Sequence, residues 1–142
     1  MQRNSQKPPS RDFELARVLL VDDDLTSRLT LQALLEAGGY FVDSAASAAE
    51  AVGKMDERQY ELVLSDLQME SPEAGLKVLA HARLMDYKPA TALLTTYQNE
   101  RPADPRRPVL IEPEAVPELL TKVADLISQR AARIVERQLK HA

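Results

Sequence analysis

The 142-residue sequence contains no cysteine, and only 4% of its residues are aromatic. Without cysteine the chain forms neither disulfides nor thiolate metal sites, and the absence fits a reducing compartment such as the cytoplasm. Because 44% of the residues are hydrophobic and so few are aromatic, we expect a core made mostly of Leu, Val, Ile and Ala. The length predicts one domain of ordinary size.

Long apolar runs are also missing. No run approaches the roughly 20 residues that span a bilayer, and the opening MQRNSQKPPSR has no apolar signal-peptide core. Residues 1–14 are therefore expected to be a flexible tail. The net charge of −4 gives no general attraction to membranes or nucleic acid, so neither is a predicted partner.

Short apolar segments alternate with helical patterns along the rest of the chain. Strands are expected at residues 17–21, 40–45, 60–66, 91–96 and 108–113. Helices are expected from Leu25 to Gly38, from Ser47, from Gly75 and from Glu114 onward. Thr26 or Ser27 is the expected cap of the first helix, and Ser47 with Glu50 forms a capping-box pattern. Such alternation predicts right-handed βαβ units and a doubly wound parallel sheet.

Polar residues end four of the expected strands. They are Asp22, Asp23 and Asp24, then Asp66, Thr95 with Thr96, and Glu112. Because ligands of open α/β sheets bind at the carboxyl ends of the strands, we expect these residues to share one shallow cleft. Clustered carboxylates suit a hard divalent cation such as Mg²⁺. A carboxylate beside it can accept a phosphoryl group, as in covalent catalysis.

The segments VLLVDDD, ELVLSDLQM, ALLTTY and LIEP resemble, in order and spacing, the receiver domains of two-component response regulators. The resemblance covers roughly residues 15–130 and implies a flavodoxin-like (CheY-like) five-stranded sheet with strand order 2-1-3-4-5. It implies that Asp22 and Asp23 bind Mg²⁺, that Asp66 is the phosphoacceptor and a metal ligand, and that Gln68 offers its backbone carbonyl to the metal. Thr95 resembles the switch hydroxyl.

The same resemblance implies a bacterial, cytoplasmic signalling protein that is not an enzyme. Its expected partners are a sensor histidine kinase or phosphotransfer protein and a downstream effector protein.

Three positions depart from the family pattern. Glu112 stands where the family has a lysine, and a like-charge contact at about 4 Å costs on the order of 4 kcal/mol at an effective dielectric near 20. Arg101, Arg106 and Arg107 are candidates for a replacement charge. Val109 replaces the usual switch aromatic. Residues 97–108 hold three prolines, which predicts a loop or a single turn in place of the fourth helix.

The last helical pattern continues past Gln129 with apolar Ile134, Val135 and Leu139. This favours either pairing with a second chain, including a homodimer, or a solvated helix end. The sequence thus divides into a tail (1–14), a receiver domain (15–130) and a helical extension (131–142).

Three functional hypotheses remain open. A stand-alone receiver could accept phosphate on Asp66, or Glu112 could have disabled the chemistry and left a pseudo-receiver that signals by protein contact. The change from lysine to Glu112 disfavours efficient phosphorylation and so favours the pseudo-receiver. The alternative from another class is a small metal-dependent phosphohydrolase, because Asp22 and Asp24 mimic an Asp-x-Asp nucleophile motif.

Overall fold

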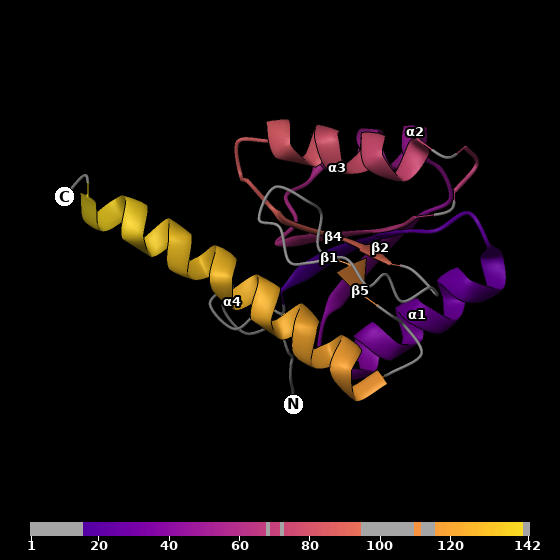
Figure 1. Cartoon of the computed structure of the whole chain (residues 1–142), viewed down its shortest axis with the longest axis horizontal. Helices are drawn as coiled ribbons and strands as arrows, with labels where there is room; N and C mark the ends of the chain where they lie inside the picture. Colours follow the sequence, from indigo (N-terminus) through magenta and orange to yellow (C-terminus); the bar gives the residue numbers. More distant parts are fainter. Residues whose placement is uncertain (1–15, 68, 72, 95–109, 112–115, 141–142) are drawn as a thin grey trace, which may run out of the picture.

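The computed structural model describes residues 16–67, 69–71, 73–94, 110–111 and 116–140 (Figure 1). The elements in chain order are β1 (Arg17–Val21), α1 (Leu25–Ala37), β2 (Phe41–Ala45), α2 (Ala48–Glu57), β3 (Leu62–Asp66), α3 (Ala74–Leu84), β4 (Ala90–Leu94), β5 (Leu110–Ile111) and α4 (Val116–Lys140).

The five strands form one parallel sheet in the order β2-β1-β3-β4-β5. This confirms the predicted fold class and strand order. β1 lies between β2 and β3, and Val18, Leu19, Leu20 and Val21 are completely buried, because a central strand of a parallel sheet is covered on both faces. That explains why the strand is an uninterrupted apolar run.

Helices cover both faces of the sheet. α1 and α4 lie on one face, and α2 and α3 lie on the other (Figure 1). The α1/α4 side packs Leu31, Leu35, Leu119 and Val123 against alternate strand residues. The α2/α3 side packs Ala51, Met55, Val78 and Ala82 in the same way; these two layers hold the strand ends rigidly in place.

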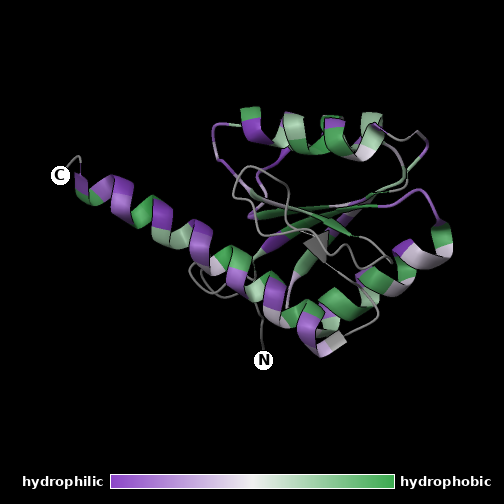
Figure 2. Cartoon of the chain, in the orientation of Figure 1, coloured by the Kyte–Doolittle hydropathy of each residue, from purple (hydrophilic) through white to green (hydrophobic). Residues whose placement is uncertain are grey.

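The start of α1 differs from the prediction. The N-cap is Asp24, whose carboxylate accepts a hydrogen bond from the Ser27 N–H at 2.8 Å, so the assignment to Thr26 or Ser27 was wrong. A carboxylate at this position satisfies a free amide and also interacts favourably with the helix dipole. α1 buries Leu31 and Leu35, whereas Leu25 and Leu29 are exposed. Figure 2 shows hydrophobic residues along much of α1.

The start of α2 agrees with the prediction. The Ser47 hydroxyl accepts from the Glu50 N–H at 3.1 Å. Glu50 in turn accepts from the Ala46 N–H at 2.9 Å, one residue earlier than the usual capping box.

Several predicted boundaries shift by a residue or two. β2 begins at Phe41, β3 at Leu62, and α3 at Ala74. The loop predicted in place of a fourth helix, at residues 97–108, lies outside the described residues, as do the tail 1–14 and Val109.

α4 is one helix of 25 residues that continues to Lys140, as the pattern past Gln129 predicts. None of the helices within the described ranges combines the length and apolar character that crossing a bilayer requires.

Candidate functional site

Three carboxylates meet at the carboxyl edge of the sheet. Oxygen atoms of Asp22, Asp23 and Asp66 all lie within 4.8 Å of one another. β1 and β3 are adjacent and parallel, so residues that follow β1 come to lie beside Asp66, the last residue of β3. The structure therefore brings together three of the acids for which the sequence predicts one cleft.

Asp22 is held firmly and is only 1% exposed. Its N–H donates to the Ala45 carbonyl at 3.0 Å, and its Oδ1 accepts from the Asp24 N–H at 3.0 Å. These contacts fix both the backbone and the side chain of Asp22 at the strand tip. By contrast Asp23 is exposed and Asp66 is half-buried, so the cluster opens toward solvent on one side.

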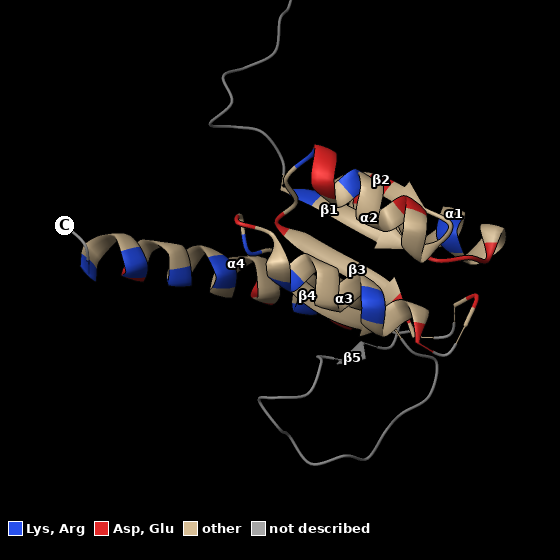
Figure 3. Ribbon diagram, turned by 90° about the horizontal axis from the view of Figure 1, so that it is seen from above, with Lys and Arg blue, Asp and Glu red and all other residues tan. Residues whose placement is uncertain are grey.

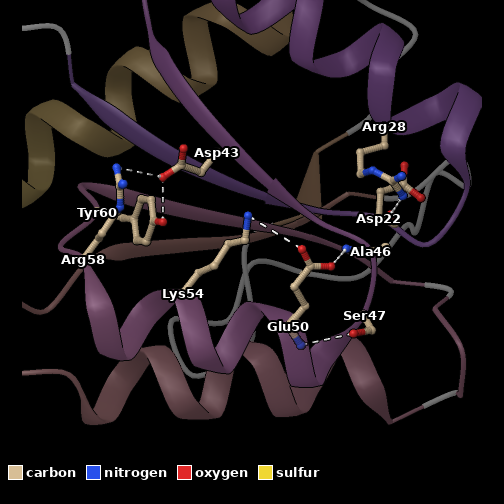
Figure 4. A network of polar contacts seen from close by, with 9 residues as sticks. All are labelled: Asp22, Arg28, Asp43, Ala46, Ser47, Glu50, Lys54, Arg58 and Tyr60. Carbon is tan, nitrogen blue, oxygen red and sulfur yellow. Dashed lines mark hydrogen bonds and ion pairs between the residues drawn. The ribbon is translucent and has the colours of Figure 1, made fainter.

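Arg28 approaches the same tip from α1. Its Nη1 donates to the Asp22 carbonyl oxygen at 2.8 Å (Figure 4). Sequence reasoning considered only Arg101, Arg106 and Arg107 as compensating cations, and all three lie outside the described residues. The available signal was the position of Arg28 four residues after the helix cap, which returns its side chain toward the N-terminal end of α1.

Asp24 does not join the cluster. Its carboxylate caps α1, although the sequence predicted it in the shared cleft. The Asp22-x-Asp24 arrangement of the phosphohydrolase hypothesis thus has its second acid engaged in a structural hydrogen bond.

The backbone of Asp66 is closely packed against α3. A Cβ added at Gly75 would lie 2.6 Å from the Asp66 carbonyl oxygen, and the next residue, Leu67, donates its N–H to the Leu94 carbonyl at 2.9 Å. Glycine at position 75 therefore permits the close approach that fixes the end of β3. Asp66 also takes part in a polar interaction of its own.

Gln68, Thr95, Thr96 and Glu112 lie outside the described residues. Their predicted places in the cleft remain predictions.

The residues present fit a hard divalent cation. The donor set consists of carboxylate oxygens only, and one of them belongs to a buried aspartate. Three like charges at this separation repel one another strongly unless a cation neutralises them. Mg²⁺ commonly uses one or two protein carboxylates and retains several waters, which matches a cluster that is open on its exposed side.

A second polar cluster lies away from these acids. The Tyr60 hydroxyl, which belongs to a buried side chain, donates to Asp43 Oδ2 at 2.8 Å, and Arg58 lies 3.9 Å from the same carboxylate (Figure 4). Burial raises the pKa of Tyr60, and the hydrogen bond to Asp43 raises it further. This cluster ties β2 to the start of β3 and was not singled out by the sequence.

His81 on α3 has a polar partner on the neighbouring helix. Its Nε2 lies 2.8 Å from Asp56 Oδ1 on α2. The contact joins α2 and α3.

Fold and site together define a doubly wound α/β protein with a cluster of carboxylates at the carboxyl edge of its sheet. The family model of the response regulator receiver domain matches residues 18–105. The match covers more than half of the chain, and the protein belongs to this family. It is thus a receiver domain of the kind that operates in two-component signalling.

Similar known proteins are also regulatory proteins. The transcriptional regulatory protein ZraR of Escherichia coli O157:H7 is 33% identical over 82 residues, which cover 58% of this chain and 18% of ZraR. The gliding motility regulatory protein of Myxococcus xanthus is 45% identical over 53 residues, which cover 37% of this chain and 7% of that protein. Both relatives are bacterial, as expected for the family. The chain spans about a fifth of the length of the ZraR proteins that it matches.

Solved receiver structures have the same fold. The response regulator TrrA of Thermotoga maritima, in complex with Mg²⁺-BeF, is 31% identical with a TM-score of 0.66, covering 79% of this chain and 99% of that one. A CheY-like receiver domain protein of Methanospirillum hungatei is 25% identical with a TM-score of 0.71, covering 84% and 99%. These comparisons give no support to the phosphohydrolase alternative.

Proposed function

We propose that this receiver domain binds Mg²⁺ at Asp22, Asp23 and Asp66, with the Gln68 carbonyl as a further ligand, and that Asp66 accepts a phosphoryl group. The observation that carries the proposal is the convergence of the three carboxylates within 4.8 Å. The similarity to TrrA, whose structure contains Mg²⁺-BeF, supports the same ion. A bound divalent cation would supply positive charge for the phosphoryl oxygens.

In the reaction, a carboxylate oxygen of Asp66 attacks the phosphorus of the donor, and the bond from phosphorus to the leaving group breaks. The product is an acyl phosphate on Asp66. The Thr95 hydroxyl would then hydrogen-bond the new phosphoryl oxygens. In this proposal the protein signals by changing its contacts with other proteins and does not turn over a substrate. The phosphoryl donor is a histidine kinase or phosphotransfer protein, and an effector protein receives the signal. Family membership supports a cytoplasmic location.

Glu112 favours a second candidate, the pseudo-receiver. A glutamate beside the phosphoryl site repels an incoming dianion, by on the order of 4 kcal/mol at about 4 Å and a dielectric near 20. In that case the acidic pocket persists but phosphorylation is slow or absent, and the fold serves contact alone.

Intact-mass spectrometry of the protein after incubation with Mg²⁺ and acetyl phosphate separates the two candidates. We expect one phosphoryl adduct on Asp66 that hydroxylamine cleaves, as for an acyl phosphate, and that does not form in Asp66→Asn. Absence of any adduct, with beryllium fluoride also failing to bind, would leave the pseudo-receiver. Glu112→Lys should accelerate labelling; an unchanged rate would show that the glutamate charge does not limit the reaction.

A further inference from the structure

Glu70 links the segment after β3 to the start of α2. Its Oε2 accepts a hydrogen bond from the Ala48 N–H at 3.1 Å, and Ala48 is the first residue of α2. The first amides of a helix have no carbonyl partner within the helix, so an outside acceptor satisfies one of them here. A carboxylate at this end also interacts favourably with the helix dipole. The contact is thus a cap for α2 that comes from a distant part of the chain.

This contact spans the carboxyl end of β1. Ala48 comes shortly after the end of β2 at Ala45, and Glu70 comes shortly after the end of β3 at Asp66. β1 lies between those two strands in the sheet, and two members of the carboxylate cluster follow it directly. In Figure 3, which looks onto α2 and α3, acidic residues occupy the loops at the arrowhead end of the sheet. The hydrogen bond therefore runs alongside the cluster, on the side that α2 and α3 cover.

The described residues between the end of β3 and Glu70 are also held by other elements. The Leu67 N–H donates to the Leu94 carbonyl of β4 at 2.9 Å, and Met69 packs against the apolar layer of α2 and α3. Gln68 stands between Leu67 and Met69 in the sequence. The contact made by Glu70 is a solvent-exposed hydrogen bond, so a substitution there removes it without opening a cavity in the core.

We propose that Glu70 is a positioning residue of the metal site, an inference that rests on the function proposed above. By tying the segment after Asp66 to α2, Glu70 holds the backbone from which the Gln68 carbonyl reaches Mg²⁺, and it does not touch the metal itself. A segment that is already in place loses less conformational entropy when the ion binds, so the affinity for Mg²⁺ is higher. Because such coupling is reciprocal, bound Mg²⁺ in turn strengthens the contact between Glu70 and Ala48.

Isothermal titration calorimetry of the full chain with Mg²⁺ tests this role. In Glu70→Ala the dissociation constant should rise about three- to tenfold, as expected for the loss of one exposed hydrogen bond. Glu70→Gln should bind Mg²⁺ almost as well as the wild type, because its amide oxygen can still accept from the Ala48 N–H although the charge is gone. Glu73→Ala is the matched control, since it removes an exposed acid at the start of α3 that makes no capping hydrogen bond with its side chain.

The two substitutions of Glu70 separate the hydrogen bond from the charge. Equal losses of affinity in Glu70→Ala and Glu70→Gln would assign the effect to the charge and overturn the proposal. Wild-type affinity in Glu70→Ala would also overturn it, while leaving the metal site intact. A wild-type chain that binds no Mg²⁺ would overturn the proposed metal site and this inference together.

Hydrogen exchange of the Ala48 amide, followed by NMR, gives a readout that does not depend on phosphorylation. In the wild type Mg²⁺ should slow this exchange, whereas in Glu70→Ala the exchange should be fast with and without the ion. The Ala51 amide, which donates to the Ser47 carbonyl at 3.0 Å in the same turn, is the internal control and should respond little. Equal slowing at Ala48 and Ala51 would report a general stabilisation by the ion and would overturn the proposal, as would no slowing at Ala48.

Discussion

The close contact between Gly75 and Asp66 predicts how much stability the protein loses when Gly75 is replaced by alanine. In Gly75→Ala the new Cβ would lie 2.6 Å from the Asp66 carbonyl oxygen, so α3 or the end of β3 has to move by roughly half an ångström to restore a normal contact. Overpacking of this kind costs about 1–3 kcal/mol. The helix preference of alanine returns about 0.5–1 kcal/mol. The difference of these two ranges is a net loss of about 0–2.5 kcal/mol in the free energy of unfolding, with a centre at about 1 kcal/mol.

Gly53 on α2 provides the matched control, since a Cβ there meets no atom within 4 Å. Gly53→Ala should stabilise the protein by about 0.5–1 kcal/mol. Urea denaturation followed by far-UV circular dichroism measures both variants, because the chain has no tryptophan for fluorescence. Mg²⁺ affinity should fall in Gly75→Ala alone, since only that change displaces Asp66. The reasoning is refuted if Gly75→Ala is as stable as Gly53→Ala.

Other consequences concern the metal site, the α4 anchor and the alkaline limit of stability. Asp22→Asn should raise the thermal unfolding midpoint in metal-free buffer, because it removes one of three repelling charges. It should also abolish the stabilisation that Mg²⁺ gives the wild type. Thermal melts with and without Mg²⁺ measure both effects, and a lower midpoint in metal-free buffer would contradict the first. Arg130→Ala should cost about 2 kcal/mol in urea denaturation, since two charge-assisted hydrogen bonds to the carbonyls of Tyr87 and Lys88 are lost; a loss within error of zero would show that the anchor is unimportant. Burial, together with the charge of Asp56, raises the pKa of Tyr87 to about 12. The unfolded chain releases this proton near pH 10, so the unfolded state binds fewer protons above that pH and stability should fall from about pH 10 to 12. Tyr87→Phe should reduce that fall, and an identical pH profile in the variant would contradict the assignment.

Local sequence signals predicted the elements well where one physical cause dominates. The short apolar run of β1, rich in strand-forming residues, predicted a strand buried on both faces. Ser47 with Glu50 marked the start of α2 through hydrogen bonds between near neighbours. The cap of α1 was misassigned because Asp24, Thr26 and Ser27 are all competent cap residues. Only the backbone geometry at the end of β1 selects Asp24.

The buried face of α1 illustrates the same limit. Leu25 and Leu29 have the spacing of an apolar face, yet Leu31 and Leu35 are the residues that face the sheet. Helical periodicity says that a face exists, but with apolar residues on more than one side of the helix it does not say which side packs. The angle at which α1 meets the sheet decides this.

The amino-acid sequence by itself determined the order of strands and helices, the acids at the strand ends and the long last helix, because each depends on residues close together in the chain. The meeting of Asp22 and Asp23 with Asp66 followed from the predicted parallel sheet. Tertiary structure alone decided the other contacts between distant groups, which are Arg28 with the Asp22 carbonyl, Gly75 with Asp66, and Arg130 with the turn before β4. Such contacts depend on the register of adjacent parallel strands and on how the helices lie across them, and no local pattern encodes either.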